Sequence, residues 1–147
     1  MTMHDTSVAN LLQSVPFFRV ADIAASVHFY VDGLGFAITH RWTPGGLLRW
    51  CWLERGGAAL MLQQPETAGH DARVPEGPVG VGVSICFMCE DAVALYHEFR
   101  ARGLEPSRPI VSNGLWNTAL DDPDGYRLEF ESATDVPEGT RLAEPEG

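Results

Sequence analysis

The chain has 147 residues, of which 45% are hydrophobic, and this is enough to bury most of the surface of one domain around a single core. Its 20 acidic residues outnumber 10 basic ones, and the resulting net charge of −10 would repel phosphate backbones and anionic membranes, which excludes nucleic acid as a general partner. Three cysteines, the lack of a cationic and apolar leader and the lack of a membrane-length apolar run lead us to expect a cytoplasmic protein with free thiols and no membrane partner.

After a tail over residues 1–13, the first half of the chain predicts a strand followed by a helix. The strand is a short apolar run over residues 15–20. Asp22 offers a carboxylate that can cap the first turn of a helix. Apolar residues then recur at helical spacing up to Gly33 and Gly35, which can end the helix because glycine adopts left-handed backbone.

Three more strands follow this helix. In the first of them, every second residue has a large side chain. We therefore expect Phe36, Ile38, His40 and Trp42 to lie on one face of the strand. The next strand carries Leu48, Trp50 and Trp52 on one side. A Gly56-Gly57 turn then leads into a strand over residues 58–63.

The second half repeats this order. It predicts, in turn, a strand over 81–89, a helix over 92–102, a weak strand over 105–108, a strand over 115–120, an Asp-Pro-Asp-Gly turn and a strand over 126–131. Residues 64–80 form the linker between the halves. Residues 133–147 are expected to be an acidic C-terminal tail.

Comparison of the chain with itself supports a duplication. An offset of 68 residues aligns five physically similar pairs: Asp22 with Glu90, Gly35 with Gly103, Gly57 with Gly125, Leu60 with Leu128, and Leu62 with Phe130. These pairs cover a helix start, a helix end and a last strand. Leu60, Leu62 and their counterparts suit the helix-facing side of a sheet, which leaves Met61, Arg127 and Glu129 on the other face.

Four segments in this order resemble the vicinal-oxygen-chelate (VOC) superfamily of glyoxalases, bleomycin resistance proteins and dioxygenases. They are Phe18 to Asp22, the Phe29-Tyr30 pair, Leu34 to Phe36, and the closing segment from Asp122 to Phe130. The resemblance runs over residues 14–132. It implies a single α+β domain of two βαβββ modules, over residues 14–63 and 81–132, that form an open, cup-shaped mixed sheet with the helices packed outside. Since many relatives are homodimers, some with sites shared between chains, it also implies a homodimer.

Metal-using relatives take one ligand from the first and one from the last strand of each module. Carried over, these places are Val15, Met61, Ser84 (or Val83 if the register slips) and Glu129. Only Glu129 binds divalent ions well, and one carboxylate cannot replace the water shell of a cation. We therefore expect no metal and no cofactor.

The remaining histidines and cysteines do not restore a metal site. Four histidines fall in the tail, in the linker or on the polar sides of helices: His4, His70, His28 and His97. His40, on a strand near Trp42, is the one that could enter the cup. Cys86 and Cys89 spell C-x-x-C, but residues three apart on a strand point to opposite faces, so buried thiols are expected there.

The large aromatic side chains of the predicted strands favour a pocket for a flat or apolar organic molecule. The predicted ligand-binding residues are Glu129, Met61, Trp50, Trp52, Trp42, Trp116, Phe17, Arg19 and His40. A carboxylate in an apolar cup needs a partner. For Glu129, that partner is either Arg19 or Arg49 of the same chain, or a cationic ligand.

Three functions remain open. The first is a metal-free protein, similar to the bleomycin-resistance branch, that binds a bulky aromatic or partly cationic small molecule in the cup. The second is a metal-dependent VOC enzyme (a lyase, isomerase or dioxygenase) that uses Glu129 together with His40. The third is a structural or interaction module, which a filled cup would indicate.

Overall fold

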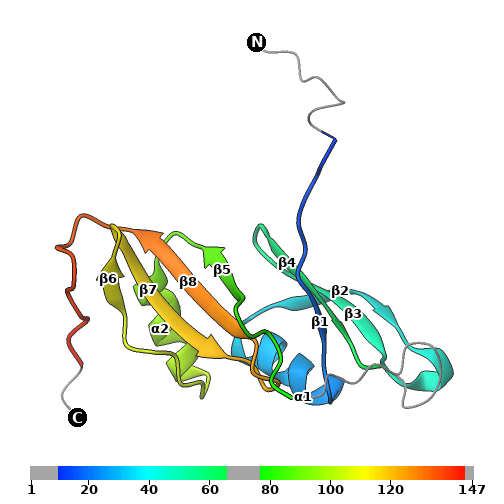
Figure 1. Ribbon diagram of the computed structural model, residues 1–147. Helices are drawn as coiled ribbons and strands as arrows, with labels where there is room; N and C mark the ends of the chain where they lie inside the picture. Colours follow the sequence, from blue (N-terminus) through cyan, green and yellow to red (C-terminus); the bar gives the residue numbers. More distant parts are fainter. Residues whose placement is uncertain (1–9, 66–76, 145–147) are drawn as a thin grey trace.

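A computed structural model describes residues 10–65 and 77–144, and each half of the chain forms its own four-stranded sheet (Figure 1). The first module consists of β1 (Phe17–Arg19), α1 (Ile23–Val27), the π-helix His28–Gly33, β2 (Ala37–Trp42), the short 3-10 turn Pro44–Gly46, β3 (Trp50–Arg55) and β4 (Ala58–Gln63). The second module consists of β5 (Ser84–Met88), α2 (Ala92–Ala101), β6 (Ile110–Ser112), β7 (Leu115–Asp121) and β8 (Arg127–Ala133).

The two sheets have the same topology. Their strand orders are β1-β4-β3-β2 and β5-β8-β7-β6, and in each the first and last strands of the module run parallel while the other pairs are antiparallel. The predicted α+β fold of two βαβββ modules with open, mixed sheets is therefore confirmed. No helix in the described parts of the chain combines the length and the apolar character that crossing a bilayer requires.

The first helical segment begins as predicted but ends differently. The Asp22 carboxylate accepts hydrogen bonds from the backbone N–H groups of Ala24 and Ala25. Gly35 has a φ of +79°, the left-handed backbone expected at a helix end. Gly33 instead lies inside the π-helix, where an added Cβ would be 2.9 Å from Leu104 Cδ1, so close packing explains this glycine.

Strand β2 contains a register shift that the alternation pattern did not predict. Ile38 is opposite Leu53 on the helix-facing side, whereas His40 is opposite Trp52 on the other side, with the irregularity between them. The predicted single face of Phe36, Ile38, His40 and Trp42 is therefore wrong. Such a bulge adds one residue to a strand and so turns the residues after it to the opposite face.

The weak strand predicted over residues 105–108 is also wrong. The strand at this point of the module is β6, which starts at Ile110. Pro106 and Pro109 have no N–H to donate to a sheet, which interrupts regular pairing here. Ser107 still contacts β7, since its N–H donates to the carbonyl of Ala119 at 2.7 Å.

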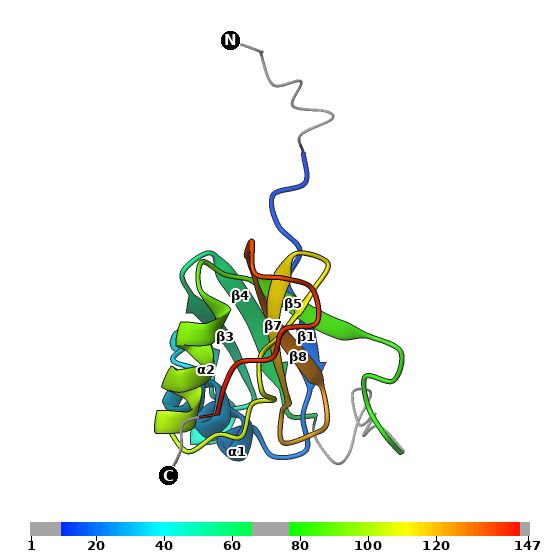
Figure 2. The same ribbon diagram turned by 90° about the vertical axis from the view of Figure 1, so that its left-hand side faces the viewer.

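Part of the expected C-terminal tail packs against the second sheet. Gly139 N–H donates to the carbonyl of Val111, Val111 N–H donates to that of Thr140, and Leu142 N–H donates to that of Pro109, each at 2.9 Å. The segment, red in Figure 2, runs beside β6, the strand at the edge of the second sheet. It thereby covers the hydrogen-bonding groups of the edge strand β6.

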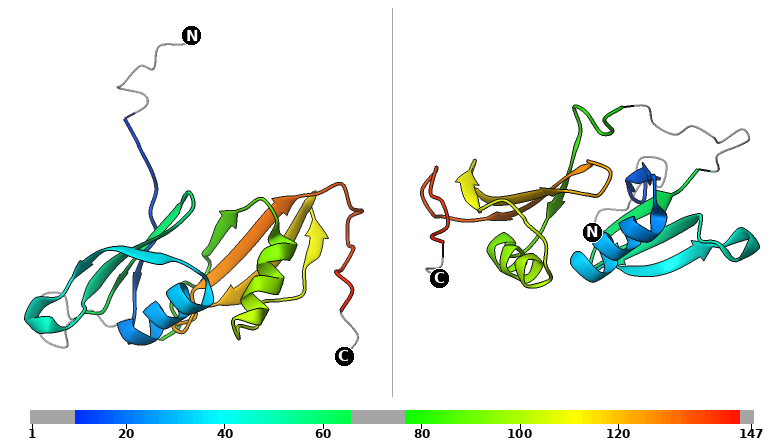
Figure 3. Two further views of the ribbon diagram at one scale, coloured as in Figure 1. Left: turned by 180° about the vertical axis from the view of Figure 1, so that it is seen from behind. Right: turned by 90° about the horizontal axis from the view of Figure 1, so that it is seen from below.

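One core joins the helix-facing sides of both modules. Leu60, Leu62 and Leu128 are fully buried, and Phe130 is 4% exposed, as the duplicated pattern predicted. Phe36 of the first module packs against Phe87 of the second, with ring centroids 6.0 Å apart. Figure 3 shows α2 lying across only one face of the second sheet, so the opposite face of that sheet is open.

Candidate functional site

The open face of the first sheet carries two rows of large side chains. Residues directly opposite each other in a sheet share a face, and the register gives the rows Phe17–Met61–Trp52–His40 and Arg19–Gln63–Trp50–Trp42. We call these eight residues the aromatic face. The structure therefore brings together all the predicted ligand-binding residues except Glu129 and Trp116.

Several large side chains of the aromatic face are exposed to solvent. Phe17 is 46% exposed and Trp42 is 52% exposed. The guanidinium carbon of Arg19 lies 5.9 Å from the centroid of the Phe17 ring, which places a positive charge at the border of this face. Exposed apolar patches of this kind mark binding surfaces more often than they mark ordinary solvent-facing sheet.

The middle of the open face of the second sheet is acidic instead, with Arg127 at one end of β8 on the same face. Glu129 and Glu131 lie two residues apart on β8 and share this face with Asn117, Cys86 and Met88. The Asn117 side-chain amide donates to Glu129 Oε1 at 3.3 Å and to Glu131 Oε1 at 2.9 Å. We call these five residues the acidic face. One neutral amide holds the two carboxylates side by side without neutralising their charge.

No arginine of the described residues forms an ion pair with Glu129. Arg19 lies on the first sheet and Glu129 on the second, and the side chain that contacts Glu129 is Asn117. Of the two possibilities left open by the sequence, the partnership with Arg19 or Arg49 is thus absent. The negative charge of Glu129 remains available to a cationic group.

Trp116 is not part of either open face, so its assignment to the site needs correction. It is opposite Ser132 and Val111, which are both buried on the side of the second sheet that faces α2. Residues alternate between faces along β7, and Asn117 and Ala119 are the ones that share a face with Glu129. Trp116 is half-buried on the α2 side of its sheet and does not face the same side as Glu129.

The C-x-x-C pair is split between the two faces of its sheet. Cys86 lies opposite Glu129 and is exposed, so the expectation that its thiol is buried is wrong. Partial burial first, and then the negative charges of Glu131 and Glu129, raise the pKa of Cys86 to about 11, so its thiol stays protonated at neutral pH. Cys89 is half-buried and its Sγ contacts the backbone carbonyl of Glu131 at 3.4 Å.

The donor set at the family's ligand places does not fit a metal ion. Met61 lies on the first sheet opposite Phe17, whereas Ser84 and Glu129 lie on the second sheet opposite Arg127 and Cys86, so only one of these places offers a carboxylate. Val15 precedes β1 and offers no donor. Within residues 10–65 and 77–144, no three His, Cys, Asp or Glu side chains gather in a way that could hold an ion.

A cavity of about 1020 Å³ lies between the modules, and Cys86 and Met88 of the acidic face are among the residues that line it. Its walls include Phe36, Arg55, Glu98, Phe99 and the strand β5. None of the predicted ligand-binding residues lines it. Within one chain, therefore, the aromatic face and the acidic face do not form the walls of a shared cavity.

Comparison with known proteins gives consistent matches. The family model for the Glyoxalase/Bleomycin resistance protein/Dioxygenase superfamily matches residues 11–130. Bleomycin resistance proteins of Geobacillus stearothermophilus and Staphylococcus aureus are 27% identical over 138 residues, covering 82% of this chain and 96% of theirs.

Solved structures agree with this result. A glyoxalase/bleomycin resistance protein/dioxygenase from Nocardioides is 25% identical, with a TM-score of 0.62 over 94% of this chain and 95% of its own. A bleomycin-binding protein complexed with bleomycin is 24% identical, with a TM-score of 0.62 over 83% of this chain and 98% of its own. A bleomycin resistance determinant encoded on the transposon Tn5 is 23% identical, with a TM-score of 0.65 over 86% of this chain and 100% of its own. The last two show a shared fold.

Proposed function

Because the chain belongs to the glyoxalase/bleomycin resistance protein/dioxygenase superfamily, we propose that it is a metal-free, bleomycin-resistance-like protein that binds a flat, partly cationic small molecule. The bleomycin resistance proteins of Geobacillus stearothermophilus and Staphylococcus aureus are among its relatives. A binding role of this kind needs shape and charge but no catalytic group. The donor set described above, which lacks the ligands for an ion, supports binding without a metal.

The observation that best supports this ligand chemistry is the contrast between the two open faces. Trp50 and Trp52 offer ring surface on which a planar group can stack with little loss of conformational entropy. Glu129 and Glu131 offer paired carboxylates to a cation, and Arg127 on the same face pairs with Asp121 and not with Glu129. A molecule with a flat body and a cationic arm satisfies both faces.

We propose that a homodimer brings the two faces together. Strands β1 and β5 are at the ends of their sheets, so a second copy could place its β5 beside β1 of the first. The aromatic face of one chain would then continue into the acidic face of the other. Apolar side chains near these edges are exposed in a single chain: Phe17 by 46%, Val83 by 62% and Met88 by 65%. A two-fold axis would make two equivalent ligand grooves.

We also propose a cytoplasmic location. The described residues include three free cysteines, Cys51, Cys86 and Cys89, and none of them is in a disulfide. Free thiols persist best in a reducing compartment.

Titration of the purified protein with bleomycin tests the proposed function. We expect heat of binding with one ligand per chain, unchanged by a chelator. We also expect about tenfold weaker binding in Glu129→Gln, because a charge-assisted contact contributes about 1.5 kcal/mol. Glu105→Gln removes the same charge from an exposed loop and is the matched control. Elemental analysis that finds near-stoichiometric metal, lost in Glu129→Gln, would instead support the metal-dependent enzyme.

Sedimentation analysis tests the homodimer. The unchanged protein is expected to sediment as a dimer, and Phe17→Asp as a monomer, because a carboxylate at the joined edge would be desolvated without a partner. Leu47→Asp is the control, since Leu47 is 62% exposed in the β2–β3 connection and lies outside both joined strands. A monomeric unchanged protein at micromolar concentration would contradict the shared groove.

A further inference from the structure

Several contacts join the two modules of one chain, and two of them lie at corresponding places under the duplication. The offset of 68 residues that relates the modules also relates Tyr30 to Glu98. Tyr30 reaches the turn before the last strand of the second module, and Glu98 reaches the end of β3, just before the corresponding turn of the first module. Tyr30 donates its hydroxyl hydrogen to Asp122 Oδ2 at 2.7 Å. Glu98 accepts from Arg55, which follows the counterpart of Asp122 by one residue.

The first contact is buried and well satisfied. Tyr30 is 0% exposed and Asp122 is 5% exposed. The other carboxylate oxygen of Asp122 accepts the N–H groups of Asp124, Gly125 and Tyr126 at 2.9 to 3.0 Å. Burial first, and then the charge of Asp122, raise the pKa of Tyr30, so the phenol remains a donor. Separation of Tyr30 from Asp122 would leave buried polar groups unpaired. We therefore expect this contact to stay closed, and we call it the fixed contact between the modules.

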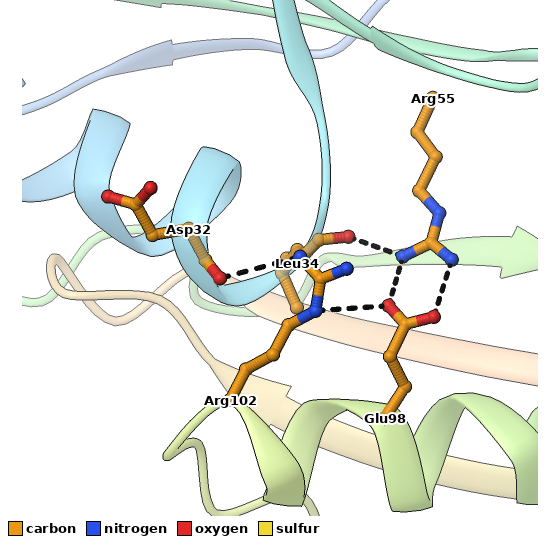
Figure 4. A network of polar contacts seen from close by, with 5 residues as sticks. All are labelled: Asp32, Leu34, Arg55, Glu98 and Arg102. Atoms are coloured by element: carbon orange, nitrogen blue, oxygen red, sulfur yellow. Dashed lines mark hydrogen bonds and ion pairs between the residues drawn. The ribbon is translucent and has the colours of Figure 1, made fainter.

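The second contact is partly exposed to solvent. Arg55 donates to both carboxylate oxygens of Glu98, at 2.6 and 2.9 Å, and to the backbone carbonyl of Leu34 at 2.6 Å (Figure 4). The Arg55 and Glu98 side chains are 34% and 32% exposed and line the 1020 Å³ cavity between the modules. Arg102 adds a longer contact of 3.6 Å to the same carboxylate. Gly35 makes room for this arrangement, since a Cβ there would lie 2.7 Å from the guanidinium.

We propose that Arg55 and Glu98 are positioning residues for the ligand groove, because they set the angle between the two modules of a chain around the fixed Tyr30–Asp122 contact. This inference rests on the proposed function. If each groove combines the aromatic face of one chain with the acidic face of the other, the angle within each chain sets the width of both grooves at once. The ion pair thus controls affinity for the ligand without touching it.

Glu98→Gln tests this role, with two readouts on the intact protein. The first needs no ligand: amide hydrogen exchange is expected to be about tenfold faster in β5, which borders the cavity, and unchanged at Asp124 to Tyr126 beside the fixed contact. The second is calorimetric titration with bleomycin, for which we expect a Kd about five- to tenfold higher. Arg55→Lys, which keeps the charge but loses the two-point contact, should change both readouts in the same direction.

His28→Gln is the matched control, because the exposed His28–Asp32 pair joins residues within the first module only. It should leave exchange and Kd unchanged. Faster exchange in Glu98→Gln with an unaltered Kd would overturn the proposal and reduce the ion pair to a stabilising contact, and unaltered exchange would overturn it as well. Failure of the unchanged protein to bind bleomycin would reject the proposed function and with it the ligand role of Glu98. The exchange result would still decide whether the pair controls the module angle.

Discussion

Replacement of Asp122 by alanine is expected to lower the free energy of unfolding by about 3–5 kcal/mol, the largest loss of stability that we predict for a single polar residue. This carboxylate is 5% exposed and accepts hydrogen bonds from the Tyr30 hydroxyl and from three backbone N–H groups of the following turn. Alanine would leave the buried phenol without an acceptor. It would also release the turn that contacts the first module, where Asp124 accepts from Ala21 N–H at 2.9 Å.

Urea unfolding at one fixed protein concentration measures this loss, since the stability of the proposed dimer would depend on concentration. Asp121→Ala is the matched control. Asp121 is the preceding residue, but its side chain is 57% exposed and pairs with an exposed Arg127 at 3.4 Å, so we expect a change within about 0.5 kcal/mol. Tyr30→Phe should fall between the two, at about 1–3 kcal/mol. An Asp122→Ala variant as stable as the control would refute the importance of this contact.

The second large effect concerns the aromatic face. Trp50→Ala is expected to raise the Kd for bleomycin about 30-fold, which corresponds to about 2 kcal/mol, the loss typical of a central aromatic residue in a binding surface. Trp50 lies between Gln63 and Trp42 in one row of that face. Its removal would take away the ring on which a flat ligand stacks, while the helix-facing core of the sheet stays intact.

Trp116→Ala provides the control because it removes the same side chain from the opposite kind of surface. Trp116 lies on the α2 side of its sheet, opposite Ser132 and Val111. Calorimetric titration should therefore show a Kd close to that of the unchanged protein, although thermal unfolding should show a lower Tm. Equal losses of affinity in both variants would mean that binding responds to stability and not to ring contacts on the aromatic face.

The sequence by itself determined the modules and most of their faces. The offset of 68 residues predicted that the second half repeats the strand and helix order of the first, and the two sheets have the same order. Strict alternation predicted that Leu60 and Leu62 face the helix while Met61 does not. These predictions succeed because side chains in a regular strand alternate with a period of two, so one correctly placed residue places its neighbours.

The alternation of residues along a strand did not predict the buried face where both faces carry similar residues or where the strand is irregular. Both sides of β7 carry apolar residues, with Leu115 and Ala119 on one and Trp116 and Leu120 on the other, so alternation did not identify the face toward α2. In β2, the bulge after Ile38 reversed the faces. Pairing with a neighbouring strand decides both points, and a single strand's sequence does not contain that pairing.

Only the tertiary structure decided how the two modules sit together. Tyr30 and Asp122 are 92 residues apart, and Arg55 and Glu98 are 43 apart, and neither pair has a periodicity that links its members. These contacts, and the packing of Phe36 on Phe87, place the helix-facing sides of both sheets in one core. The helix-facing side of each sheet is the more apolar one, so its burial is favoured. The aromatic face and the acidic face are therefore left on the outside of a single chain.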